Sequence, residues 1–347
     1  MWLIGIRDLQ WRLRRFLVGM LATGLVFAIT LLLSGIAASL HNEPQRIVRA
    51  FAADAWVVPA GVSGPFTSTQ PLAVALVRRV ASSPDVRATS AVVLARGTAR
   101  LPTLPDVNVV GYQLGGLGAP RVHDGRPIRH DGELVVDATL GRHVGDRLGL
   151  GKRTFTVVGT ARGMTYFGGT PVVFMTLRDA QLLLYDGSPV ATAIVTKGRP
   201  RGLAPDVAVL TNAQVLADLR RPVDVGAQTI GFLDVLLWAV AAGIIGAILY
   251  MSAIERIRDF AVLKAVGASN RFVMSALALQ ATILAITAAL TAMLLAALLG
   301  PVFPMPVEIP AIAYPALLVV ALVVGLLASA AGLRRAVRVD PAAAFGG

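Results

Sequence analysis

Hydrophobic residues along this chain gather in four long runs. A long region of mixed polarity separates the first run from the other three. The runs cover residues 16–40, 230–254, 272–300 and 311–333. Each run is long enough to cross a bilayer, which takes about 20 residues of α-helix. We therefore predict a membrane protein with four transmembrane α-helices in a 1+3 arrangement, joined on one side by a short loop at 301–310.

The region between the first two runs, residues 41–228, has a different pattern. Pro, Gly and charged residues are frequent in it, and no apolar run is long enough to span a membrane. Short β-rich runs alternate with helical stretches and turn-forming residues. They predict strands at 54–58, 86–95, 107–112, 133–136, 154–160, 171–175 and 191–196, and helices at 72–81, 177–184 and 213–219. We expect one α+β extracytoplasmic domain, with a hairpin at 145–162 that turns around Gly151 and Lys152.

Basic residues flank the apolar runs on alternating sides. Lys and Arg number four in residues 1–15, four in 255–271 and three in 334–347, while the loop 301–310 has none. The excess of basic residues on cytoplasmic loops then places both termini and 255–271 in the cytoplasm. Residues 1–15 mix Trp and Leu with Arg, which is typical of an interfacial helix. The 25-residue run that follows is too long for the core of a signal peptide.

The amino-acid composition excludes several classes of function for this chain. A hydrophobic share of 55% in 347 residues indicates a membrane protein with one water-facing region. The chain has no cysteine, which excludes disulfides and thiol chemistry. The net charge of +12 comes from scattered residues rather than from a basic stripe with aromatics, so we expect no nucleic-acid partner. Membrane topology and contact with anionic lipid head groups explain the charge better.

Signals for catalysis are weak throughout. The chain has no P-loop of the G-x-x-x-x-G-K-[ST] type, no G-x-S-x-G elbow and no H-E-x-x-H helix. The four histidines, His41, His123, His130 and His143, lack metal-ligand spacing. Only His123 and His130 with Asp124 and Asp131 offer a weak metal candidate. We therefore expect no catalytic, cofactor or metal site in this chain.

Two features allow more than one interpretation. The glycine-rich segment 163–171, GMTYFGGTP, is either an ordinary connector or a contact point for a substrate or partner. Asp234 lies near the outer end of the second apolar run. It is interpreted as an acid favoured by the dipole of a helix N-terminus, with binding of a cation or a lipid amine as the alternative.

The segment between the second and third apolar runs has the make-up of a helix. Residues 255–271 read ERIRDFAVLKAVGASNR, in which Glu255–Val266 are helix formers without Pro or Gly and Gly267 supplies a stop. Ser269 and Asn270 are suitable N-caps for the next helix. Apolar groups lie on both faces of this helix. It is either a surface loop that enforces topology or a helix that offers one face to a partner.

The sequence of residues 255–271 resembles the cytoplasmic coupling segment of FtsX-like permeases. This family includes the MacB and LolC/LolE transporters and the DevC-type permeases. Residues 145–162 are similar to the hairpin of MacB-type periplasmic domains, and the tail with Asp340 and Pro341 is similar to the family's ending. The short N-terminal match at 8–14 and the length are closer to DevC-type and related actinobacterial permeases. The resemblance implies that residues 255–271 dock into a cleft of a cytoplasmic ATP-binding subunit. The implied coupling residues are Glu255, Arg256, Arg258, Asp259, Phe260, Leu263, Lys264 and Gly267.

The resemblance also implies a function and partners. It implies the permease subunit of an ABC transporter in the bacterial plasma membrane, paired with a second copy or a homologous permease. A separate cytoplasmic ATPase would bind ATP and Mg, and its hydrolysis would move the extracytoplasmic domain to export or extract a lipid, peptide or drug. The alternative is an FtsX-like regulator that transmits this motion to an extracytoplasmic cell-wall hydrolase without transport. An extracytoplasmic adaptor would accompany the first function.

Overall fold

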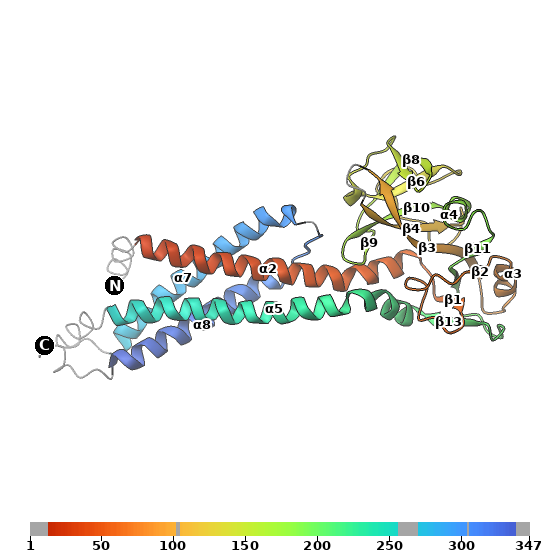
Figure 1. Ribbon diagram of the computed structural model, residues 1–347. Helices are drawn as coiled ribbons and strands as arrows, with labels where there is room; N and C mark the ends of the chain where they lie inside the picture. Colours follow the sequence, from red (N-terminus) through yellow and green to blue (C-terminus); the bar gives the residue numbers. More distant parts are fainter. Residues whose placement is uncertain (1–12, 102–104, 256–269, 304, 338–347) are drawn as a thin grey trace, which may run out of the picture. The chain divides into compact units, whose positions relative to one another are not determined.

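The protein divides into two compact units (Figure 1). The computed structural model describes residues 13–101, 105–255, 270–303 and 305–337. The first unit, here called the inserted domain, is Ser39–Ala227, and the second, the helical unit, joins the residues up to Ala38 with those from Gln228 onward. Two helices, α2 (Leu13–Ala50) and α5 (Asn212–Glu255), contribute residues to both units. We call α2 and α5 the linking helices.

Both linking helices are longer than the apolar runs inside them. Helix α2 continues past Leu40 to Ala50, and α5 begins at Asn212 rather than near residue 230. The helix expected at 213–219 is confirmed, but it does not end there, because these residues form the first turns of α5. The sequence conceals this continuity because polarity changes along each helix, and because Pro44 and Pro222 lie inside them.

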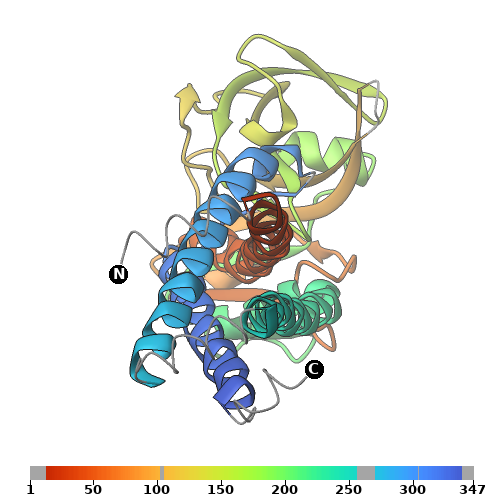
Figure 2. The ribbon, with the colours of Figure 1, turned by 90° about the vertical axis from the view of Figure 1, so that its left-hand side faces the viewer.

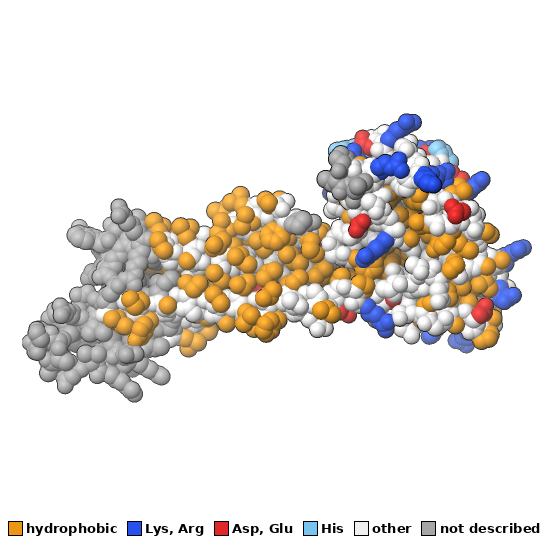
Figure 3. Space-filling view, viewed as in Figure 1, with side chains coloured by type: hydrophobic (Ala, Val, Ile, Leu, Met, Phe, Trp, Pro, Cys, Tyr) orange, Lys and Arg blue, Asp and Glu red, His pale blue; other side chains and the backbone are white. Residues whose placement is uncertain are grey.

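The helical unit packs α2 and α5 with α7 (Asn270–Leu299) and α8 (Ala313–Val337), and a 3₁₀ turn, η2 (Gly300–Val302), follows α7. Figure 2 shows these helices, with α2 between α7 and α5. Alanines dominate their shared core, as in Ala285, Ala288 and Ala292 of α7, which allows close approach of the helices. Hydrophobic side chains cover the visible surface of this unit, whereas charged side chains are spread over the inserted domain (Figure 3).

Three helices contain stretches long and apolar enough to cross a membrane. These stretches are Leu17–Ala50, Asn212–Ala247 and Thr282–Val302. In α8 the described apolar stretch is shorter, at Ala313–Val324. Length and composition thus support three of the four expected spans, and the four-helix count stays a prediction.

The inserted domain is built around a closed ring of six strands. Its strands are β1 (Ala55–Pro59), β2 (Leu72–Ala73), β3 (Ala88–Arg100), β4 (Asp106–Tyr112), β5 (Asp124–Gly125), β6 (Glu133–Asp137), β7 (Arg147–Leu150), β8 (Arg153–Ala161), β9 (Thr165–Tyr166), β10 (Thr170–Thr176), β11 (Val190–Ala191), β12 (Ala193–Lys197) and β13 (Val207–Thr211). Pairing runs β3-β4-β10-β6-β8-β7 and returns to β3, so the ring closes. Strands β12, β1 and β13 extend it from β3.

The ring separates two hydrophobic cores. Leu134, Leu148, Phe155 and Val157 belong to the core inside the ring, next to α4 (Leu177–Leu184). A second core lies on the other face of the sheet and includes Val135 and Val158, since side chains alternate along a strand. This second core also receives the inserted-domain ends of both linking helices.

The α+β character expected from the sequence is confirmed, and strands form in all seven predicted places. The hairpin turning at Gly151 is confirmed as β7–β8, and Gly151 has a φ of +55°. The helix expected at 72–81 is partly wrong. Leu72 and Ala73 pair with β11 instead, and the helix α3 covers only Leu76–Ala81. The 3₁₀ turn η1 (Ala138–Leu140) completes the elements of this domain.

Candidate functional site

Glu43 fastens α2 to the glycine-rich segment of the inserted domain. Its side chain is 1% exposed. One carboxylate oxygen accepts a hydrogen bond from Thr165 Oγ1 at 2.8 Å, and the other accepts one from the Gly169 N–H at 3.2 Å. A carboxylate taken out of water is costly unless donors surround it, so burial here depends on both bonds. Glu43 therefore holds helix and hairpin together.

The hairpin that Glu43 holds has an unusual backbone. Phe167, between β9 and β10, has a φ of +58°, which is costly for a bulky residue. The Asn108 side-chain amide donates to the carbonyls of Tyr166 and Thr170 at 3.2 and 3.1 Å and so fixes both ends of the turn. The Arg96 guanidinium lies 4.4 Å from the centre of the Phe167 ring. Segment 163–171 is thus a fixed part of the domain, and no observation assigns it a ligand.

Asp218 plays the corresponding part on α5. Its side chain is 1% exposed and accepts hydrogen bonds from the Phe66 N–H at 3.0 Å and from the Thr67 hydroxyl. Gly64 lies against the same carboxylate, and a Cβ there would come within 2.3 Å of Asp218 Cγ. The loop around Phe66 is therefore attached to α5 as the hairpin is attached to α2.

Aromatic rings join the two attached segments. Phe66 and Tyr166 meet edge to face with centroids 5.3 Å apart. Phe51, at the end of α2, lies 4.8 Å from Trp56 and 6.3 Å from Phe66. Trp56 also donates from Nε1 to Asn212, the first residue of α5, at 2.8 Å. Burial raises the pKa of the Tyr166 phenol.

Apolar residues of the linking helices complete the junction. Ile47 and Val48 of α2 and Val215 and Leu219 of α5 are all buried in the core outside the strand ring. Close-packed cores transmit a displacement rather than absorb it. Within the inserted domain, therefore, the ends of α2 and α5, the two loops and the sheet form one packed body. We call it the helix junction.

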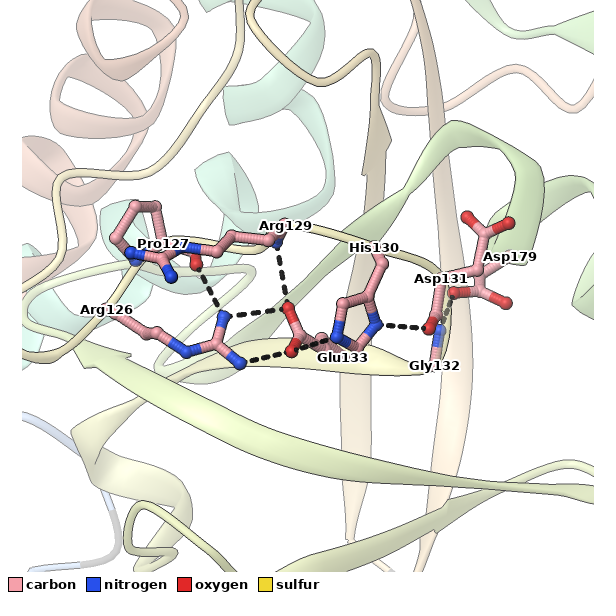
Figure 4. Close-up of polar contacts among 8 residues, drawn as sticks. All are labelled: Arg126, Pro127, Arg129, His130, Asp131, Gly132, Glu133 and Asp179. Carbon is pink, nitrogen blue, oxygen red and sulfur yellow. Dashed lines mark hydrogen bonds and ion pairs between the residues drawn. The ribbon is translucent and has the colours of Figure 1, made fainter.

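A second polar cluster locks the loop that precedes β6 (Figure 4). Glu133, 3% exposed, accepts from the Arg126 guanidinium, from the Arg129 N–H at 2.8 Å, and lies 2.9 Å from His130 Nε2. The Arg126 hydrogen bonds lower the pKa of Glu133 from its ordinary 4.5 to about 2. Beside it, the buried Asp179 accepts from the Gly132 N–H at 2.6 Å and ties the loop to α4. Asp179 Oδ1 also lies 3.4 Å from Arg153 Nη1, so the two carboxylates hold this loop against α4 and β8 as a structural clamp.

The weak metal candidate gains no support from this geometry. His130 Nδ1 lies 3.0 Å from the Asp131 carbonyl, and Asp131 accepts from Thr176 Oγ1 at 2.6 Å. Asp124 accepts from the Gly125 N–H. Among the described residues, no group of three or more His, Asp or Glu side chains is arranged to hold a metal ion.

Asp234 has a partner that the sequence did not predict. It lies 22 residues beyond the first residue of α5, so its interpretation as an acid at a helix N-terminus is wrong. Its Oδ2 accepts a hydrogen bond from Ser34 Oγ of α2 at 2.8 Å. Polar side chains within a membrane bundle commonly bond between helices. Asp234 therefore links α5 to α2 within the helical unit, a contact that hydropathy alone could not reveal.

Of the coupling residues expected from the sequence, Glu255 alone belongs to the part of the chain that the structure describes. Glu255 is the final residue of α5. Arg256, Arg258, Asp259, Phe260, Leu263, Lys264 and Gly267 lie outside the described residues. The helix junction, by contrast, had no sequence signal as a site. In the sequence, Glu43 and Asp218 are acidic residues in polar stretches, and their burial becomes evident only in the fold.

Comparison with known proteins defines the class of the chain. The family model of the MacB-like periplasmic core domain matches residues 17–225, and that of the FtsX-like permease C-terminal matches residues 231–341. The chain therefore belongs to the family of ABC transporter permeases of the MacB/FtsX type.

Similar proteins from mycobacteria support this assignment. The chain is 43% identical over 344 residues to an ABC transporter permease of Mycobacterium tuberculosis (strain ATCC 25618 / H37Rv), covering 99% of both chains. A second permease of the same strain is 41% identical over 348 residues, again over 99% of both. The family is that of a permease subunit, which is not itself an ATPase.

Two solved structures show more distant similarity. The periplasmic region of MacB from Actinobacillus actinomycetemcomitans is 11% identical, with a TM-score of 0.37, over 48% of this chain and 92% of that chain. The extracellular domain of the transporter YknZ from Gram-positive bacteria is 12% identical, with a TM-score of 0.34, over 46% of this chain and 99% of that chain.

Proposed function

We propose that this permease transmits ATP-driven motion from a separate cytoplasmic ATPase to its MacB-like inserted domain, which exports or extracts a lipid, peptide or drug. The observation that carries the proposal is the helix junction, in which Glu43 and Asp218 attach both linking helices to the domain. A rigid attachment serves a subunit whose task is to relay movement. In this account both termini and residues 255–271 face the cytoplasm of a bacterium and the inserted domain lies outside.

The proposed site of contact with the ATPase is the coupling segment. Phe260 and Leu263 are assigned as apolar anchors, and Glu255, Arg256, Arg258, Asp259 and Lys264 as groups that orient the contact by charge. Buried anchors usually carry most of the affinity of an interface, while rim charges steer association. Gly267 is assigned as the helix stop. ATP and Mg would be bound by the partner alone.

A second copy, or a homologous permease, is proposed to pack against α5. This helix has strongly exposed apolar residues, among them Phe232 and Val235. Small residues recur every four positions at Ala239, Gly243 and Ala247, and no heavy atom lies within 4 Å of where a Gly243 Cβ would be. Such spacing lets two helices approach closely.

Partner capture tests this function. The chain is co-expressed with candidate ABC ATPases from the same organism, purified in mild detergent, and assayed for bound ATPase and ATP turnover. Phe260→Ala is expected to reduce capture more than Arg258→Ala. Wild-type capture and turnover in both variants and in Gly267→Val, at equal expression, would contradict the coupling assignment. Recovery of a cell-wall hydrolase as the outer partner, without substrate movement, would favour the regulatory alternative over transport.

A further inference from the structure

A group of hydrogen-bond donors without a matching acid lies where α2 leaves its apolar run. His41, Gln45 and Arg49 share one face of α2 at four-residue spacing, and Arg220 of α5 reaches the same place. Arg220 Nη2 lies 3.4 Å from His41 Nε2, Gln45 Nε2 lies 3.5 Å from the same nitrogen, and Arg49 Nη2 lies 3.5 Å from Gln45 Oε1. We call these residues the donor cluster.

The donors of this cluster are poorly satisfied. Contacts of 3.4–3.5 Å exceed the usual 2.7–3.2 Å, and two donor groups converge on one imidazole nitrogen. Arg220 Nε is buried and has no hydrogen-bond partner. An anion bound beside this guanidinium would supply the missing acceptor, because an unpaired buried donor is costly.

Nearby carboxylates are engaged elsewhere. Glu43 accepts hydrogen bonds from the hairpin, and Asp218 accepts hydrogen bonds from the loop around Phe66. Asp224, the next acid along α5, is exposed. Within the described ranges, no ion pair joins Arg49 or Arg220 to a carboxylate. The positive charge of the cluster therefore lacks an internal counter-ion.

The distance of the donor cluster from the apolar run of α2 indicates which kind of anion it meets. His41 directly follows Leu40, the end of the apolar run. At 1.5 Å per residue, Gln45 lies about 6 Å and Arg49 about 12 Å beyond His41 along α2. The polar layer of a bilayer is roughly 5–7 Å thick on each side, and side chains on α2 lean toward its N-terminus, back toward the apolar run. The backbone of Arg49 lies beyond this layer, but the Arg220 guanidinium reaches His41 and the Arg49 guanidinium reaches Gln45, so both donor groups approach the depth of lipid head groups.

We propose that the donor cluster binds the phosphate of an anionic phospholipid in the leaflet adjacent to the inserted domain. Arginine pairs with phosphate oxygens through two parallel N–H donors, which satisfies Arg220 and Arg49 better than imidazole or amide does. Bound at this point, the lipid head group bridges α2 and α5 beside the helix junction. This inference requires only that the chain resides in a membrane, not that it transports.

Lipid retention tests the inference on the full chain. The protein is placed in nanodiscs of phosphatidylcholine and phosphatidylglycerol in equal amounts, released into mild detergent, and examined by native mass spectrometry for bound lipid. Phosphatidylglycerol should be enriched on the wild type, and Arg49→Gln and Arg220→Gln should each reduce the enrichment about fivefold. Arg147→Gln, which removes an exposed arginine from β7, should leave it unchanged.

Three results would overturn the inference. One is equal retention of the two lipids by the wild type. Another is the same loss in Arg147→Gln as in the cluster variants, which would indicate a general charge effect. The third is displacement of the lipid by millimolar inorganic phosphate, which would mark a site for soluble anions. If Arg220→Gln fails to fold, Arg49→Gln alone decides, because its exposed side chain has only one long contact.

Discussion

Phe66 and Tyr166 meet edge to face with ring centroids 5.3 Å apart, and this contact connects the loop held by α5 to the hairpin held by α2. Glu43 of α2 holds the hairpin that contains Tyr166, Tyr166 contacts Phe66, and the loop around Phe66 is held by Asp218 of α5. Two helices far apart in sequence are thereby tied together within the inserted domain. A permease that relays motion needs such a connection, because a flexible attachment would lose the displacement.

Loss of the Glu43 carboxylate should loosen the hairpin. Glu43→Leu removes both acceptors and leaves the Gly169 N–H and the Thr165 hydroxyl buried without these hydrogen bonds. We expect a cost of about 1.5–3 kcal/mol and faster amide exchange at Gly169. Hydrogen exchange with mass spectrometry measures this, with the exposed Asn42→Ala as the control. Unchanged protection of Gly169 would remove Glu43 from the junction.

Two helix glycines should respond in opposite ways to the same substitution. A Cβ at Gly35 of α2 would come within 2.5 Å of Val307, whereas one at Gly243 of α5 meets no heavy atom within 4 Å. Alanine favours a helix over glycine by about 1 kcal/mol, so Gly243→Ala should preserve or raise thermal stability in detergent. This expectation for Gly243→Ala applies to the monomer in detergent, whereas Gly35→Ala should lower stability by overpacking within one chain. Equal melting temperatures for the two variants would contradict the packing of residues 305–309 on α2.

The inserted domain should fold when residues 39–227 are expressed alone. This range includes the hydrophobic cores of the domain and the helix ends that complete the core outside the strand ring. The absence of cysteine means that its stability should not depend on oxidants. Circular dichroism and amide exchange measure folding directly. A chain without cooperative unfolding would show that the helical unit is required for the core.

The Glu133 clamp should make this domain less stable in acid. The folded-state pKa of about 2 lies below the ordinary 4.5, so the stabilisation is complete above about pH 4.5 and is lost as pH falls toward 2. Glu133→Gln should therefore lower the free energy of unfolding by about 2 kcal/mol at pH 7. Chemical denaturation at several pH values should show this difference shrinking near pH 2. A difference independent of pH would contradict the ionic contribution of Glu133.

The sequence predicted the sheet better than it predicted the site. Runs such as 107–112 and 171–175 are apolar and β-branched enough to predict strands from local pattern alone. The continuity of α5 across Pro222 was not predictable in this way, since its polar half resembles an independent helix. Glu43, Asp218 and Asp234 were missed as partners because their contacts join residues more than 120 positions apart. No local pattern encodes such contacts.

Movement of the inserted domain during the ATP cycle is the most direct test of this account. Because the chain has no cysteine, Ser188→Cys on the exposed turn after α4 provides a single position for a spin label. Pulsed electron paramagnetic resonance on the permease dimer with its ATPase measures the distance between the two labels. We predict that ATP binding shifts this distance distribution and that Glu43→Leu weakens the shift. Identical distributions with and without ATP, in a complex that hydrolyses ATP, would contradict the relay of motion through α2 and α5.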